Sequence, residues 1–263
     1  MPSASPPHAI ITNDDGIDSE GLWHLAVTAA AAGLDVVVAA PAAEASGSGS
    51  AIKASQQNGR VEINRRELPA PAQMVPAYAI RATPAFIVFA AVRGAFGGQP
   101  RYVLSGINRG PNTGRAVLHS GTVAAAMTAA GYGLAAAAFS LDVHENTGRP
   151  EWETAAAVAA EVLPVLPNVP GGVVLNVNVP NIPATRLRGI RSARLASFGA
   201  VQAIVPSAAD GYLQVNVSDK REDPEPGSDS AALAAGYASV TPLRSVCEVA
   251  PDGLPWQPLP SPA

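Results

Sequence analysis

Apolar positions in the first part of the chain follow strand spacing and helical spacing in turn. A short apolar run at 8–12 precedes a segment at 19–33 in which Leu and Ala recur at helical spacing. The run LDVVVAAP at 34–41 is rich in β-branched residues, which is typical of a strand buried on both faces. Ser19 is placed to cap the helix and Gly33 to end it. The pattern therefore predicts a βαβ unit.

The same alternation continues after an irregular polar stretch at 42–81. Pro84 follows Thr83 in the arrangement that favours the start of a helix. Strands that alternate with helices predict an α/β fold with a doubly wound parallel sheet. The further helices are predicted at 82–94, 121–133 and 151–166, and the further strands at 102–104, 135–141 and 173–179.

Beyond Pro183 the pattern changes to short apolar segments separated by charged or Gly/Pro loops. These segments resemble antiparallel strands, and a proline-rich tail follows at 251–263. We therefore expect two parts: an α/β catalytic core at 1–183, and a β-hairpin-rich extension with its tail at 184–263, which we expect to take part in oligomer contacts. The short segments lie at 187–198, 203–206, 211–217 and 236–243.

Composition narrows the classes of function. A formal net charge of −4 gives no broad cationic field, so duplex nucleic acid is not an expected partner. The single cysteine, Cys247, cannot form an internal disulfide, which fits a reducing compartment. The N-terminus lacks the basic and apolar regions of a secretory signal, and the apolar tract at 22–41 is interrupted by polar residues. We expect a cytoplasmic protein without membrane contact.

Polar residues directly after the predicted strands carry the candidate chemistry. In an open parallel sheet, ligands bind at the carboxyl ends of the strands. Three such groups occur here, at 13–16 (NDDG), 46–49 (SGSG) and 105–112 (SGINRGPN). They are expected to meet at one edge of the sheet.

Adjacent Asp14 and Asp15 would repel each other unless a cation held both in the ionised form. An amide oxygen from Asn108 and a hydroxyl from Ser46 would complete an oxygen-rich site suited to Mg²⁺ or Mn²⁺. Each residue alone has an ordinary structural explanation, as a turn, a helix cap or flexible loop. The combination is what favours a metal site.

A fourth group, His119 to Thr122, stands before the alanine-rich helix at 121–133. Free N–H groups and the helix dipole at that end favour an anion such as phosphate, although Ser and Thr are also ordinary helix caps. No GxxxxGK[ST], GxGxxG or GxSxG motif is present, so the sequence supports neither an NTPase, a dinucleotide enzyme nor a serine hydrolase.

These motifs resemble the SurE family of survival-protein nucleotidases. The NDDG and SGIN-x-G-x-N elements together are highly specific to that family. The matching segments lie at 10–22, 36–52, 83–85, 103–127, 174–180 and 236–243 and occur in the family's order.

The resemblance implies a Rossmann-like core with a β-hairpin extension and a C-terminal segment that exchange between subunits, giving a homodimer or homotetramer. It also implies 5′- or 3′-nucleotidase activity on nucleoside monophosphates with one divalent cation per subunit, Mg²⁺ or Mn²⁺. By motif position the metal ligands fall on Asp14, Asp15, Ser46 and Asn108. The phosphate-binding segment falls on Ser120, Gly121 and Thr122, with Asn112 nearby.

The sequence departs from the family pattern around this expected site. Charged or amide residues are usual where this chain has Ala42, Ala43 and Ala45, and an Asp is usual at Phe86. The remaining departures are Arg115, Ala116 and His119. The metal ligands are retained, but the pocket for the leaving group differs, and the nucleotide preference stays open.

The expected mechanism is in-line attack on phosphorus by a metal-activated water, with Asp14 or Asp15 accepting the proton. Two alternatives remain. One is a phosphatase of the same fold that acts on a sugar phosphate or a biosynthetic intermediate. The other is a catalytically silent protein that binds a phosphorylated ligand.

Overall fold

The computed structural model describes residues 6–144, 148–197, 224–244 and 246–247, and the backbone of four short strands between 203 and 217. A nine-stranded sheet forms its centre, with strand order β10-β15-β9-β8-β7-β1-β2-β6-β5. Neighbouring strands run parallel except for the pairs β5–β6 and β9–β15. The fold is therefore α/β with a largely parallel sheet, as predicted.

The strands of this sheet are β1 (His8–Thr12), β2 (Asp35–Pro41), β5 (Ile63–Arg66), β6 (Ala77–Ile80), β7 (Tyr102–Arg109), β8 (Ala135–Asp142), β9 (Val173–Pro180), β10 (Ile190–Ser192) and β15 (Ala238–Arg244). The helices are α1 (Glu20–Ala31), α2 (Pro84–Ala91), α3 (Gly121–Gly131), α4 (Trp152–Val162) and α5 (Asp229–Ala234), with 3₁₀ helices η1 (Gly114–His119), η2 (Leu163–Asn168) and η3 (Ala184–Arg186). Short strands outside the sheet are β3 (Gln56–Gln57), β4 (Arg60–Val61), β11 (Ala203–Ile204), β12 (Ala208–Ala209), β13 (Tyr212–Leu213) and β14 (Asn216–Val217).

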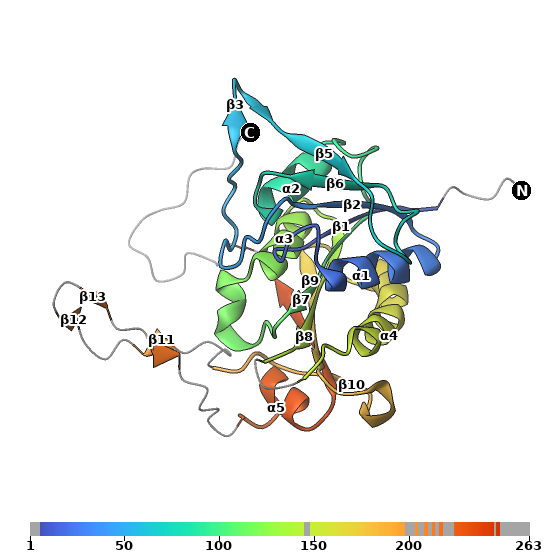
Figure 1. Ribbon diagram of the computed structural model, residues 1–263. Coiled ribbons are helices and arrows are strands. Elements are labelled where there is room, and N and C mark those ends of the chain that lie inside the picture. The colour runs from blue at the N-terminus through green and yellow to red at the C-terminus, as the bar shows by residue number, and fades with distance from the viewer. Residues whose placement is uncertain are drawn as a thin grey trace, which may run out of the picture.

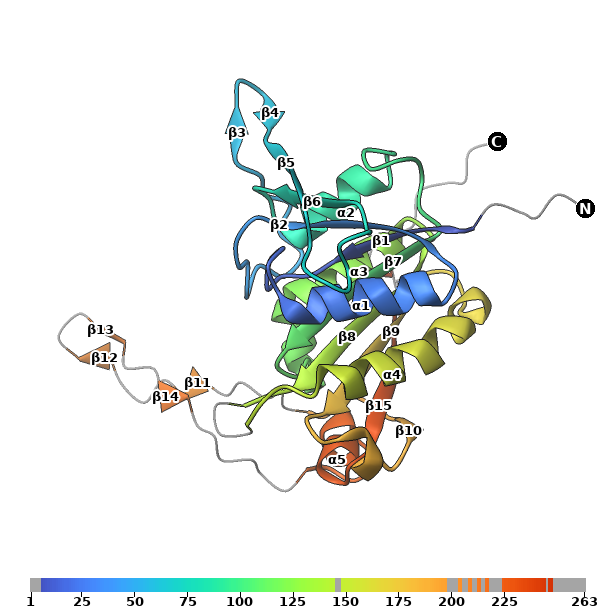
Figure 2. The same cartoon turned by 45° about the vertical axis from the view of Figure 1, so that its right-hand side comes forward.

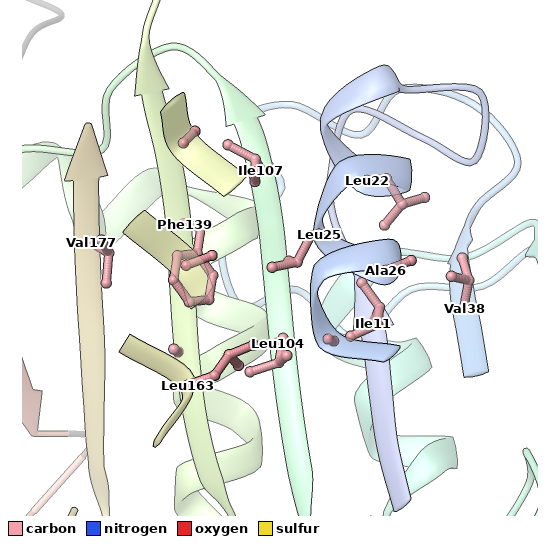
Figure 3. Packing of buried hydrophobic residues seen from close by; sticks show 14 of the residues in the cluster. Ile11, Leu22, Leu25, Ala26, Val38, Leu104, Ile107, Phe139, Leu163 and Val177 are labelled. Carbon is pink, nitrogen blue, oxygen red and sulfur yellow. The ribbon is translucent and has the colours of Figure 1, made fainter. Parts of the chain in front are cut away.

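Helices cover both faces of the sheet. Figures 1 and 2 show α1 and α4 side by side on one face, and α2 and α3 on the other. Each face buries its own apolar layer, one built around Phe139 and the other around Ile10 and Val103. Figure 3 shows Leu22, Leu25 and Ala26 of α1 pointing onto the strands of the first layer. Burial of this apolar surface supplies most of the favourable free energy of folding.

Several elements differ from the sequence prediction. Ser19 occupies the N-cap of α1, but its side chain makes no capping hydrogen bond. Strand β7 continues through the SGIN motif, which was predicted to be loop, because residues up to Arg109 still pair with β8. The stretch at 42–81, predicted to be irregular, contains four short strands, β3 to β6.

Part of the expected extension belongs to the central sheet. Strand β15 is antiparallel, but its partner is β9 of the core, whereas β10 pairs parallel with β15 and not antiparallel as predicted. Two separate antiparallel pairs, β11–β14 and β12–β13, lie apart from the sheet in Figure 1. The proline-rich tail at 251–263 lies outside the described residues, and the division of the chain at 183 stays a prediction.

Hydrogen bonds join the residues on either side of positions 198–223. Arg194 donates to Glu225 at 2.9 Å, and the backbone N–H of Ser197 donates to the same carboxylate at 3.2 Å. The backbone N–H of Asp229 donates to the Arg194 carbonyl at 2.8 Å. Among the described residues, no helix has the length and hydropathy to cross a membrane.

Candidate metal and phosphate site

Asp14 and Asp15 follow the carboxyl end of β1, and Asn108 lies near the carboxyl end of β7. These two strands are parallel neighbours, with Thr12 opposite Ser105, so their ends meet at one edge of the sheet. Asn13 closes the turn after β1, because its side chain donates to the Gly16 carbonyl at 3.0 Å and accepts from the Gly16 N–H at 3.2 Å. The turn presents both carboxylates at this edge.

Oxygen atoms from three segments gather around Asp14. The Thr122 hydroxyl donates to Asp14 Oδ1 and lies 3.3 Å from Asn108 Oδ1. The Asn108 amide nitrogen donates to the Gly110 carbonyl at 2.8 Å, so its carbonyl oxygen is the atom that faces Thr122. Asp15 accepts a hydrogen bond of 2.9 Å from the backbone N–H of Arg109.

The start of α3 packs directly on Asp14. A Cβ atom built on Gly121 would lie 2.8 Å from both Asp14 Oδ2 and Ser48 Oγ, so only glycine fits here without displacing a neighbour. The Ser120 hydroxyl caps the helix by accepting from the Val123 N–H at 3.0 Å. The positive end of the helix dipole therefore faces the carboxylate and any anion bound beside it.

Burial raises the pKa of the Asp14 carboxyl, and hydrogen bonding to Thr122 acts in the opposite direction. Burial also raises the pKa of Asp15 to about 6, and the charges of Asp14 and Glu44 add to that rise. Neither carboxylate forms an ion pair with Lys or Arg among the described residues. Buried carboxylates without a protein cation are a common setting for a bound metal ion.

The donor set fits a hard divalent cation. No group of three His, Cys, Asp or Glu side chains capable of holding a metal occurs in the described part of the chain. A metal at this edge would therefore use amide and hydroxyl oxygens beside the two carboxylates, which suits Mg²⁺ or Mn²⁺. The residues at hand are Asp14, Asp15, Asn108 and Thr122, with the Ser48 hydroxyl beside them, buried and without a hydrogen-bond partner.

Ser46 and Asn112 have other contacts. Ser46 is exposed, and its hydroxyl donates to the Glu44 carboxylate at 2.7 Å. Its loop nevertheless reaches the site, because the Ala45 N–H donates to the Asp14 carbonyl at 2.7 Å. The Asn112 side chain is buried and donates to the Ser140 hydroxyl at 2.8 Å. No hydrogen bond joins Ser46 or Asn112 to the Asp14 cluster within the described residues.

Asn112 belongs to a buried polar network under the segment that leads to α3. Its N–H donates to Asn178 Oδ1 at 2.7 Å, and its carbonyl accepts from the side chains of Asn176 and Asn178 at 2.8 and 3.0 Å. The two asparagines lie on one face of β9, where alternate positions of the apolar run VVLNVNV are polar. The network fixes the path of the chain after β7.

Asp229 of α5 fixes the same segment from the other side. Its side chain is fully buried and accepts hydrogen bonds from the backbone N–H groups of Gly114, Ala196 and Ser230, at 2.8, 3.0 and 2.9 Å. It thus connects the base of the 198–223 segment to η1, which leads into the start of α3. Sequence reasoning missed Asp229, because no local pattern relates it to Gly114.

Other polar groups at this edge were also missed. Ser48 lies in the motif SGSGS, where spacing alone does not show which serine turns inward. Asp142, at the end of β8, pairs with His144 at 2.6 Å. Of the residues that depart from the family pattern, Arg115 and His119 are exposed, and Phe86 packs near Phe89 with ring centroids 6.4 Å apart.

Comparison with known proteins shows the family of this chain. The family model described as "Survival protein SurE" matches residues 9–202. The chain belongs to the SurE family. It is 33% identical over 240 residues to the 5′/3′-nucleotidase SurE of Shigella dysenteriae serotype 1 (strain Sd197), covering 89% of each chain.

Two further relatives support the assignment to the SurE family. The 5′-nucleotidase SurE of Desulfitobacterium hafniense (strain DSM 10664 / DCB-2) is 34% identical over 244 residues, covering 90% of this chain and 91% of the relative. The crystal structure of the SurE protein from Aquifex aeolicus matches with a TM-score of 0.72 at 30% identity, covering 90% and 93% of the two chains. The resemblance and the fold class inferred from the sequence are confirmed.

Gly121→Ala should displace the Asp14 carboxylate, because the added methyl group would lie 2.8 Å from the Cβ and Oδ2 atoms of Asp14 and from Ser48 Oγ. We expect phosphatase activity to fall by about 100-fold, since small misplacements of reacting groups cost that much. The thermal shift caused by added Mn²⁺ should also shrink. Gly171→Ala is the matched control, because nothing lies within 4 Å of its Cβ position. Wild-type activity in Gly121→Ala would contradict the described packing.

The stability of the metal-free protein should fall as pH rises through about 4 to 6. The pKa of Asp15 rises from 3.8 to about 6 on folding, so the folded state holds its proton more tightly than the unfolded state in that window. Above it, the folded state carries an ionised, buried carboxylate beside Asp14. Melting temperature in chelator at about pH 5 and about pH 7.5 measures the effect. In Asp15→Asn the difference between the two pH values should shrink, and an unchanged difference would contradict the assignment.

Asp229→Ala should lower the free energy of unfolding by about 2 to 4 kcal/mol, because it removes the acceptor of two buried N–H groups, those of Gly114 and Ala196, and of the partly buried N–H of Ser230. Urea denaturation measures this. Asp18→Ala removes only an exposed ion pair to Arg66 and should cost less than about 1 kcal/mol. Equal losses in the two variants would show that Asp229 does not hold η1.

Proposed function

We propose that this SurE-family chain is a divalent-cation-dependent phosphomonoesterase that hydrolyses nucleoside monophosphates to nucleoside and phosphate. The enzyme class follows from its family, because the curated relatives are named nucleotidases, which are phosphoric monoester hydrolases. The convergence of two carboxylates without an ion pair among the described residues, an amide oxygen and a helix N-terminus at one edge of the sheet carries the proposal.

The proposed metal ligands are Asp14, Asp15, Asn108 and Ser46, which hold one Mg²⁺ or Mn²⁺ ion. When bound, the cation would polarise the phosphoryl oxygens and lower the pKa of a water molecule. Thr122 fixes the orientation of Asp14 by donating its hydroxyl proton to one carboxylate oxygen. Ser46 would have to turn away from Glu44, and because that hydrogen bond is exposed, the cost is small.

The remaining residues act on the phosphate and on the proton. The start of α3, at Ser120, Gly121 and Thr122, offers backbone N–H groups and the positive end of its dipole to the equatorial oxygens. Asp15 is the better candidate for the proton acceptor, because Asp14 is more deeply buried and already accepts from Thr122. Asn112 supports this site indirectly, by holding the chain between β7 and α3.

The wider expectations remain proposals of the same kind. They are the division into a core at 1–183 and an extension at 184–263, a homodimer or homotetramer built with that extension, and a cytoplasmic location. A small phosphorylated substrate is the expected partner, without duplex nucleic acid. The substituted positions Ala42, Ala43 and Phe86 favour one alternative, a non-nucleotide phosphomonoester, because they change the surroundings of the leaving group.

Asp14→Asn and Asp15→Asn should each lower metal-dependent phosphate release by more than about 100-fold, because each removes a charged ligand for the cation. The assay measures inorganic phosphate from a panel of nucleoside and sugar monophosphates, with Mg²⁺ or Mn²⁺ added after chelation. Asp18→Asn is the control, because Asp18 is a nearby exposed carboxylate. Near wild-type turnover in both variants would refute the site. Absence of hydrolysis of any substrate by the wild type, including aryl phosphates, would favour a silent binding protein.

A further inference from the structure

An open pocket of about 270 Å³ lies beside the candidate metal site. One wall is the loop at 42–45, and the other walls are the segments at 53–55 and 80–83. Three of the four residues of the loop wall, Ala42, Ala43 and Ala45, have small side chains, and the fourth is Glu44. The pocket is therefore large enough to hold part of a small ligand.

The loop wall connects this pocket to the catalytic edge. The Ala45 N–H donates to the Asp14 carbonyl at 2.7 Å, and the Ile17 N–H donates to the Pro41 carbonyl at 2.9 Å. Gly16 packs against the backbone of Ala43, where a Cβ would lie 3.3 Å from its carbonyl carbon. The turn that carries Asp14 and Asp15 thus rests on the wall of the pocket.

Two cations are fixed on the opposite walls. Ala54 and Ala82 form an antiparallel bridge, so Lys53 lies opposite Thr83 and Ser55 lies opposite Arg81. The Thr83 N–H donates to the Lys53 carbonyl at 2.9 Å, and the Ser55 N–H donates to the Arg81 carbonyl at 2.8 Å. Side chains opposite each other in such a pair share a face. Lys53 and Arg81 therefore lie diagonally across the two paired segments, on the same face, and both line the pocket.

Neither cation is strongly neutralised. The Lys53 ammonium group forms no ion pair among the described residues. Arg81 Nη1 lies 4.0 Å from Glu62 Oε2, and both side chains are more than half exposed. This ion pair therefore neutralises Arg81 only weakly. Glu44 is the one acidic residue of the lining, and its carboxylate accepts from Ser46. The lining therefore carries two cationic side chains and one carboxylate.

We propose that Lys53 and Arg81 bind a second anionic group on the leaving-group side of the substrate. The preferred substrates are then phosphomonoesters whose alcohol part carries another phosphate or a carboxylate, of which a nucleoside bisphosphate is one example. This inference rests on the proposed phosphomonoesterase function and narrows its substrate class. The proposal also gives a role to the alanines of the loop, which make room for a bulkier ligand with two anionic groups.

The kinetic test compares adenosine 3′,5′-bisphosphate with AMP, and 3-phosphoglycerate with glycerol 3-phosphate, so that phosphate and carboxylate are separated as the second anion. We expect kcat/KM to favour the member that carries a second anionic group, in at least one of the two pairs, by about tenfold or more. The double variant Lys53→Ala/Arg81→Ala should lose that preference through KM, with 4-nitrophenyl phosphate hydrolysis unchanged. Arg65→Ala on β5 is the control, because it removes an exposed cation outside the pocket.

A binding measurement separates failure of this inference from failure of the proposed function. Calorimetry in the presence of chelator measures the Kd of the preferred compound with two anionic groups. This Kd should be about 10- to 100-fold higher in the double variant than in the wild type or Arg65→Ala. Discrimination in binding without any hydrolysis would overturn the function and leave the pocket assignment standing. Hydrolysis with equal kcat/KM for both members of each pair, or a preference retained by the double variant, would overturn the pocket assignment alone.

Discussion

The site depends on keeping two neighbouring carboxylates close together in a place where water reaches them poorly. Burial opposes their ionisation, as the raised pKa values of Asp14 and Asp15 show. The protein offsets this cost with polar contacts. Thr122 donates to Asp14, the backbone of Arg109 donates to Asp15, and the N-terminus of α3 packs on Asp14. The divalent cation that we propose would be held by the same oxygens and would offset the remaining cost.

Further buried hydrogen bonds hold the segment that leads to α3, and so keep the contacts of Asp14 in place. Asn176 and Asn178 hold the backbone of Asn112 against β9, while Asp229 holds Gly114 from the side of α5. Both anchors act on the single stretch of chain that joins β7 to α3. The helix that packs on Asp14 is thus positioned by residues from the last third of the sequence. The resemblance to the family gave the candidate site residues, but this support became evident only from the fold.

Sequence reasoning succeeded where the apolar pattern is long and failed where it is short or polar. Helices α1 and α3 and strands β2 and β8 were predicted, because each spans seven or more residues of one clear periodicity. Strands β3 to β6 were missed, since they have two to four residues, and only β6 is largely buried. The motif SGIN was taken for a loop from its Ser, Gly and Asn, although burial between neighbouring strands keeps it in β7. Asp14, Asp15 and Asn108 were placed at one edge correctly because parallel strands end together; the contacts of Ser48, Asn112 and Asp229 are long-range and leave no local signature.

Hydrogen bonds from Arg194 and from the backbone of Ser197 to Glu225 join the chain on the two sides of positions 198–223. A loop whose ends are already joined costs little more in entropy when it is lengthened, shortened or replaced. Because the joining contacts lie outside positions 198–223, a change of length there leaves the hydrogen bonds from Gly114 and Ala196 to Asp229 in place.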